Sequence, residues 1–120
     1  MTDERVKKAI DTANALFGGP VDAGVDNSDG LLKESFVHVY GDVWSRPALG
    51  LKTRSLATVS ALVALNNPNE MHIHLKGALN IGWTREELRE LFLHLGYYAG
   101  MPAALDALRL LDEVAAAQSA

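Results

Sequence analysis

The stretch that decides the fold runs from Leu51 to Thr84 and reads LKTRSLATVSALVALNNPNEMHIHLKGALNIGWT. Its first half, Leu51 to Leu65, is apolar nearly all round, which predicts a helix buried on most of its sides. The residues NNP at 66–68 break that helix. Asn69 to Ile81 predicts a second helix, which Gly82 closes. In so short a chain, a helix this apolar suggests that a second subunit completes part of the core.

The composition is that of one globular domain spanning residues 1–120. The net charge is −4 and no basic patch appears, so neither nucleic acid nor an anionic membrane is expected as a partner. The chain has no cysteine, which excludes disulfides, thiolate metal sites and thiol redox chemistry. No apolar run is long enough to span a membrane, and the N-terminus has no signal-like apolar core. A cytoplasmic location is therefore expected.

The rest of the chain predicts four more helices and no strand. Together with the central pair they give an all-α domain of about six helices. The acidic, glycine-rich segment Asp22 to Gly30 is either a mobile flap or only a connection. The four helices are Asp3 to Phe17, Leu31 to Trp44, a helix opened by a Thr84/Glu87 capping box and ended by Gly100, and Pro102 to about Ala117.

His74 is the best candidate for a chemical role. It lies on the apolar side of its predicted helix, between Met71 and Ala78. Glu70 is one helical turn earlier, where a carboxylate can orient the imidazole for acid–base catalysis. The same pattern also fits a buried structural histidine. His72 points to another side, so the two histidines cannot share a metal ion on one helix.

Two further histidine–carboxylate pairs, Glu90 with His94 and His38 with Asp42, are better explained as solvated surface pairs. No HExxH-type spacing occurs, and no metal site is expected.

Three residues near the exit of the second predicted helix could bind an anion. Trp44 and Arg46 could form one wall of an anion pocket, or they could be a core tryptophan and a surface arginine. Arg54 enters an apolar helix and needs a partner there, either a structural carboxylate or a substrate carboxylate. Bidentate binding by a guanidinium would suit a dicarboxylic acid.

The runs GDVWSRPALGLKTRSLATVSALVAL, HIHLKGALNIGWTREELREL and YYAGMPAALDAL resemble the carboxymuconolactone decarboxylase family. The resemblance covers about Phe36 to Val114. It implies an all-α, alkylhydroperoxidase D-like domain without cofactor, assembled as a homotrimer or homohexamer with active sites near subunit contacts.

Two departures from related patterns bear on the reaction. Alkylhydroperoxidase D-like proteins use a C-x-x-C pair, a histidine and an upstream glutamate. Here His74 occupies the histidine position, Asn67 and Glu70 the cysteine positions, and Ser55 the glutamate position, which excludes thiol peroxidase chemistry and favours the decarboxylase branch. The decarboxylase also has an N-terminal R-R and a G-D-A-H-V-type motif. Residues 13–30 do not match it, so a different acid or lactone is a possible substrate.

The resemblance implies conversion of 4-carboxymuconolactone to the β-ketoadipate enol-lactone and CO2. The partner of the protein would then be a small carboxylic acid or lactone, and no cofactor is expected. Two other functions stay open: a hydratase or isomerase of the same fold, and a non-catalytic helical oligomer that binds a small acid. The hypothesis assigns His74 as the acid, Glu70 as its orienter, Arg46 and Arg54 as carboxylate ligands, and Trp44 and Tyr97 as pocket walls.

Overall fold

In the computed structural model, residues 3–20 and 30–119 are described, and their regular structure is entirely helical. If the continuous α3–η1 run is counted as one helix, this part of the chain has six helices, which confirms the all-α prediction. Nearly all of the predicted loop Asp22 to Gly30 lies outside the described residues. The elements are α1 (Asp3–Phe17), α3 (Gly30–Phe36), the π-helix η1 (Val37–Val43), α4 (Leu51–Leu65), α5 (Pro68–Asn80), α6 (Arg85–Gly96) and α7 (Met101–Ser119).

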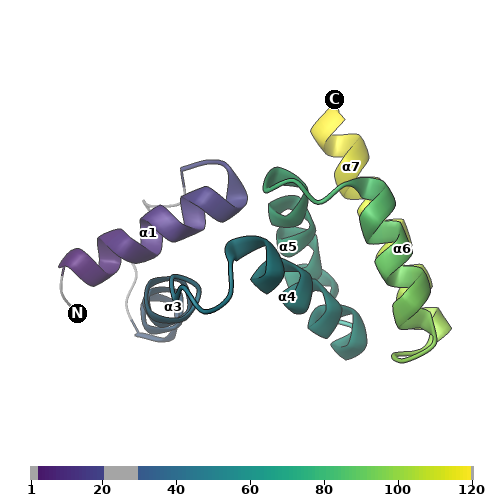
Figure 1. The fold of residues 1–120 in the computed structure, drawn as a ribbon, viewed down its shortest axis with the longest axis horizontal. Helices are drawn as coiled ribbons and strands as arrows, with labels where there is room; N and C mark the ends of the chain where they lie inside the picture. The colour runs from purple at the N-terminus through teal and green to yellow at the C-terminus, as the bar shows by residue number, and fades with distance from the viewer. Residues whose placement is uncertain (1–2, 21–29, 120) are drawn as a thin grey trace.

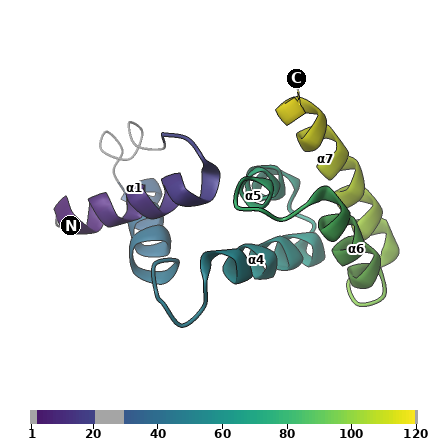
Figure 2. The same cartoon turned by 45° about the horizontal axis from the view of Figure 1, so that its top comes forward.

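Helices α4 to α7 form the larger part of the molecule, which we call the C-terminal bundle (Figure 1). Helices α6 and α7 lie side by side at one end of the molecule in both views (Figures 1 and 2). All four helices contribute fully buried side chains to one core, which is the main source of stabilisation. That core contains Val59 and Val63 from α4, Met71, Leu75 and Ala78 from α5, Leu88 and Phe92 from α6, and Ala107, Leu111 and Val114 from α7.

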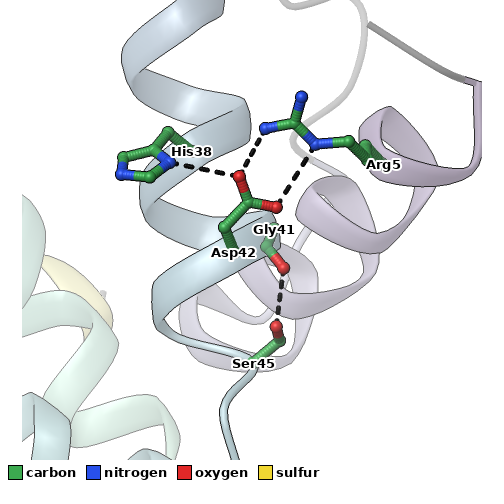
Figure 3. Close-up of polar contacts among 5 residues, drawn as sticks. All are labelled: Arg5, His38, Gly41, Asp42 and Ser45. Carbon is green, nitrogen blue, oxygen red and sulfur yellow. Dashed lines mark hydrogen bonds and ion pairs between the residues drawn. The ribbon is translucent and has the colours of Figure 1, made fainter.

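Helices α1, α3 and η1 form a second part, which we call the N-terminal unit. Its own core is small and is built on Ala9 and Val37. Gly41 lets α1 and η1 approach closely, because a Cβ there would lie 3.1 Å from the carbonyl oxygen of Arg5. The carboxylate of Asp42 accepts hydrogen bonds from the Arg5 guanidinium and lies 3.1 Å from the His38 imidazole (Figure 3).

These contacts change the acidity of Asp42. The hydrogen bond from Arg5, and then that from His38, hold the pKa of the Asp42 carboxyl below its usual value. The predicted His38–Asp42 surface pair is therefore confirmed, with Arg5 as a third member that joins α1 to η1.

The predicted helix Leu31 to Trp44 has the right extent, but its second half is a π-helix rather than an α-helix. The amide of Trp44 donates to the carbonyl of Val39, five residues earlier, at 2.8 Å. The Ser45 hydroxyl donates to the carbonyl of Gly41 at 2.6 Å. The sequence pattern does not distinguish the two helix types, because residues four apart lie on the same side in both.

A short set of contacts joins the N-terminal unit to the bundle. The side-chain amide of Asn80 donates to the carbonyls of Ala15 and Leu16, at 3.2 and 2.9 Å, where α1 ends. Gly18 follows with φ of 77°, and a Cβ on it would overlap the Asn80 side chain. Gly77 allows α1 to approach α5, since its Cβ would lie 3.2 Å from Leu16. Asn80 is exposed, yet its side-chain amide joins α5 to the end of α1.

The predicted capping box at the start of α6 is confirmed. The Thr84 hydroxyl accepts from the Glu87 amide, and the Glu87 carboxylate accepts from the Thr84 amide, both at 3.0 Å. The helix ends earlier than predicted, at Gly96 rather than Gly100, and Gly100 has the positive φ of a turn. Within the described ranges, no helix is long and apolar enough to cross a membrane.

Candidate functional site

A pocket of about 760 Å³ lies where the N-terminal unit meets α4 and α5. Its walls are mostly apolar, with a few polar groups from η1, α4 and α5, which is the usual composition of a small-molecule site. The predicted residues Trp44, Glu70 and His74 all line it. The full lining is Phe17, Leu32, Ser35, Phe36, Val39, Tyr40, Trp44, Thr58, Leu62, Glu70, Ile73, His74 and Lys76.

Aromatic rings from the N-terminal unit surround the imidazole of His74. The Trp44 ring stacks on it, with centroids 5.9 Å apart and planes 20° apart, and the Phe17 ring lies 5.5 Å away. Tyr40 contacts both of those rings, at 5.8 Å in each case. The imidazole belongs to the bundle, but the rings that fix its orientation and exclude water come from the other unit.

The carboxylate of Glu70 faces the imidazole of His74 from one turn earlier on α5. Its Oε2 lies 3.9 Å from Nε2, which is an ion-pair distance and too long for a hydrogen bond. The Glu70 side chain is 54% exposed, whereas the His74 residue is only 5% exposed. Glu70 can therefore exchange protons with solvent while His74 cannot do so directly.

The two ring nitrogens of His74 have different surroundings. Nδ1 is buried without a hydrogen-bond partner among the described residues, whereas Nε2 faces Glu70. A buried N–H without an acceptor is rarer in proteins than an unpaired acceptor, so we assign the proton of the neutral ring to Nε2. This tautomer places the proton on the side of the carboxylate.

Burial lowers the pKa of His74, and the charge of Glu70 acts in the opposite direction. The imidazole is therefore mainly neutral near pH 7. A further negative charge in the pocket would raise the pKa of His74 again and favour the imidazolium form.

Among the pocket residues to which the sequence analysis gave no role are Tyr40 and Lys76, whose side chains can donate hydrogen bonds. Burial, and then the charge of Glu70, raise the pKa of Tyr40 to about 12. The recurrence of aromatic residues at 36, 40 and 44 was the signal that could have identified Tyr40, because these positions share one side of a helix.

The three remaining predicted residues do not line this pocket within one chain. The Arg54 guanidinium donates to the carbonyls of Leu49 and Arg46, at 3.2 and 3.3 Å, so its partners are backbone oxygens rather than a carboxylate. Arg46 is exposed, and Tyr97 is 77% exposed. The carboxylate-binding roles of the two arginines and the wall role of Tyr97 stay predictions.

Glu90 and His94 are separate from the pocket. Glu90 lines another hollow, between α6 and α7, and the His94 ring packs on Tyr98 with centroids 4.9 Å apart. Over residues 3–20 and 30–119, no group of three or more histidine and acidic side chains is arranged to hold a metal ion.

The fold and the site together define a small helical protein with a carboxylate–imidazole pair in an aromatic pocket. The sequence model of the carboxymuconolactone decarboxylase family matches residues 31–113, and the chain belongs to this family. Every pocket residue except Phe17 lies within the matched range.

The chain is also similar in sequence to individual proteins. The chain is 37% identical over 120 residues to 4-carboxymuconolactone decarboxylase of Acinetobacter baylyi, with 95% of this chain and 90% of that protein covered. It is 39% identical over 69 residues to nitrosuccinic acid decarboxylase of Metarhizium robertsii, with 58% of this chain and 48% of that protein covered. An uncharacterized 15.0 kDa protein of Paracoccus denitrificans is 31% identical over 78 residues, with coverage of 62% and 58%.

Proposed function

We propose that the protein is a decarboxylase that removes CO2 from a small acid and leaves a second carboxylate in place. The names of two relatives support this, since 4-carboxymuconolactone and nitrosuccinic acid are both acids with more than one carboxylate. Each also contains a group that can receive an electron pair, an unsaturated lactone carbonyl in one and a nitro group in the other. The substrate then supplies its own electron sink, and the chemistry requires no cofactor.

The observation that carries the proposal is the Glu70–His74 pair in a mostly apolar pocket. When the C–C bond to the departing carboxylate breaks, its electron pair moves into the conjugated group and the charge settles on oxygen. A proton must then reach carbon. The negative charge of the bound substrate favours the imidazolium of His74, which gives its proton to carbon and returns to the neutral form. Glu70 stabilises that imidazolium and connects it to solvent.

The retained carboxylate needs a cation or hydrogen-bond donors. Of the described residues that line the pocket, Lys76 is the one with a fixed positive charge. It lies on the same helix as His74 and is exposed, so it can meet an anion at the rim. We assign the retained carboxylate to Lys76 in the isolated chain. If Arg46 and Arg54 hold this carboxylate instead, they must reach the substrate in an assembly, because neither lines the pocket of the single chain.

Self-association belongs to the same proposal. Large apolar side chains are exposed along α6, α7 and the turn between them, which supports burial against a second copy. They include Leu93, Tyr97, Tyr98 and Leu105. Light scattering coupled to gel filtration would measure the size of the assembly, and a monomer at working concentration would contradict this part of the proposal.

The function is tested by product analysis with the purified protein. We would offer 4-carboxymuconolactone, generated in situ, and nitrosuccinic acid, and would follow CO2 release and the organic product by NMR. Succinic acid is the matched control because it has two carboxylates but no electron sink. We expect CO2 from at least one of the first two acids and none from the third. Hydration or isomerisation without CO2 release would replace decarboxylation by one of the alternative activities, and no reaction with either acid would remove both named substrates.

A further inference from the structure

Tyr40 occupies a defined position in the pocket that the carboxylate–imidazole pair does not explain. Its ring packs against Phe36, Phe17 and Trp44, with centroid distances of 5.1, 5.8 and 5.8 Å. Phe17 and Trp44 are also the two rings that contact His74. The phenol is therefore held on several sides, and only one aromatic ring separates it from the imidazole of His74. Such fixed placement is what a group needs if it is to act on a substrate without reorganising.

The hydroxyl of Tyr40 is available to a ligand. None of the described residues forms a hydrogen bond with it, although the pocket-lining hydroxyls of Ser35 and Thr58 donate to backbone carbonyls, at 3.1 and 2.8 Å. Burial raises the pKa of Tyr40 to about 12, and the negative charge of Glu70 adds to the effect. The phenol therefore keeps its proton at neutral pH and can donate a hydrogen bond, but it cannot serve as a base.

We propose that Tyr40 is a catalytic residue whose neutral hydroxyl donates a hydrogen bond to the substrate oxygen on which negative charge develops as CO2 leaves. This assignment rests on the decarboxylase function proposed above. The bond that breaks joins carbon to the departing carboxylate, and its electron pair ends on a carbonyl or nitro oxygen. Tyr40 keeps its proton throughout. The proton that later reaches carbon comes from His74, so the two residues have separate roles.

The placement of Tyr40 suits this division of roles. His74 and Glu70 lie on α5, whereas Tyr40 lies on η1, and all three line the same pocket. A bound substrate would therefore meet the proton donor from one helix and the hydrogen-bond donor from another. The hydroxyl stabilises a charge that is weak in the substrate and strong in the intermediate, so its effect falls on kcat rather than on KM.

The first test compares Tyr40→Phe with Ser60→Ala. The phenylalanine at position 40 keeps the ring contacts and removes only the hydroxyl, and Ser60→Ala is the control because it also removes a hydroxyl, one that donates to the Leu56 carbonyl and does not line the pocket. On a substrate that the wild type decarboxylates, we expect Tyr40→Phe to lower kcat by about 10²-fold with KM changed less than about threefold. Wild-type kcat in Tyr40→Phe, or a rise in KM alone, would overturn the proposal.

The second test does not depend on turnover. The nitronate of 3-nitropropanoate carries a carboxylate and negatively charged oxygens on its nitrogen, and it is the species left when nitrosuccinic acid loses the CO2 next to its nitro group. Calorimetry would measure the binding of this nitronate to the wild type and to Tyr40→Phe. It would also measure the binding of 3-nitropropanoate in its ordinary form, in which the nitro group carries no net charge. We expect the variant to bind the nitronate at least about tenfold more weakly and the nitro form within about twofold.

Equal losses for both ligands, or a wild type that does not prefer the nitronate, would overturn the role of Tyr40 even if decarboxylation is confirmed. Selective nitronate binding without turnover would instead support Tyr40 and count against the named substrates.

Discussion

The N-terminal unit and the C-terminal bundle contribute different things to the same pocket. The bundle supplies the groups that can hold and move a proton, Glu70 and His74, from a helix buried in a continuous four-helix core. The N-terminal unit supplies the aromatic walls, from a much smaller core built on Ala9 and Val37. The difference shows that reactivity and shape have separate structural origins here, and that the complete site exists only where the two parts dock.

The interactions that stabilise the interior of the bundle differ from those that dock the N-terminal unit on it. Burial of large apolar side chains dominates inside the bundle. The docking of α1 on α5 combines the two hydrogen bonds from Asn80 with the close approach at Gly77 and the contact of Phe17 with His74. Substitutions can therefore change the chemistry, the docking or the bundle one at a time.

The largest effect is expected when the proton donor of the bundle is removed. His74→Ala should lower turnover by ~10²-fold or more, because the proton delivered to carbon then has no positioned donor. Steady-state kinetics on an acid that the wild type decarboxylates would measure this, with circular dichroism to verify the fold. His72→Ala is the matched control on the same helix and should retain wild-type activity. A loss smaller than about threefold in a folded His74→Ala protein would remove His74 from the mechanism.

A smaller effect is expected at the contact between the two parts. Gly18→Ala should destabilise the protein by about 1–2 kcal/mol, because alanine is strained at a φ of 77° and its Cβ displaces the Asn80 side chain. Urea unfolding would give the free energy, and amide exchange in α1 would locate the change. Asn80→Ala removes the displaced side chain, so the double variant should lose less than the sum of the single losses. Strict additivity would show that the two residues do not act on one contact.

A change confined to the bundle should leave the pocket intact. Thr84→Ala removes the cap of α6 and should cost about 1 kcal/mol of folding free energy. Because α6 does not line the pocket, kcat and KM should stay at their wild-type values. Thermal unfolding and kinetics on one preparation would test both statements. A change in KM would mean that the bundle transmits strain to the site and that the two parts are less independent than described.

The smallest expected effect is a shift in the pH dependence of kcat/KM. Glu70 raises the pKa of His74 against the effect of burial, so Glu70→Gln should move that pKa further down. If the imidazolium is the acid, kcat/KM falls as pH rises through the pKa of the free enzyme, and the variant should show this fall at lower pH. NMR titration of the His74 ring measures the same shift without a substrate. Glu90→Gln, in the separate hollow, is the control, and an unchanged or raised His74 pKa in Glu70→Gln would contradict the pairing.

Much of the bundle could be predicted from the sequence because its signals are local. The bounds predicted for the helix from Leu51 to Leu65 agree with α4, and the Thr84/Glu87 capping box formed as expected. The Glu70–His74 pair could be predicted for the same reason, since a spacing of four residues places two side chains on one face of a helix.

The N-terminal part of the site could not be predicted in the same way. The role of Asn80 depends on carbonyls at positions 15 and 16, far away in the chain, and no local pattern contains that contact. Tyr40 was missed because a phenol on an apolar stripe looks like a core residue until the opposite wall is known. Arg54 was recognised as a cation that needs partners, but the sequence does not show that backbone carbonyls at 46 and 49 supply them.

The attachment of α1 through Asn80 has a thermodynamic consequence for ligand affinity. Molecules in which α1 is undocked lack the Phe17 wall, so only the docked fraction is competent to bind. The apparent Kd equals the intrinsic Kd divided by that fraction, and a ligand that touches Phe17 increases the fraction as it binds. Affinity for the substrate is thus coupled to the position of a helix that carries none of the proton-transferring groups, and evolution can adjust it there without altering His74.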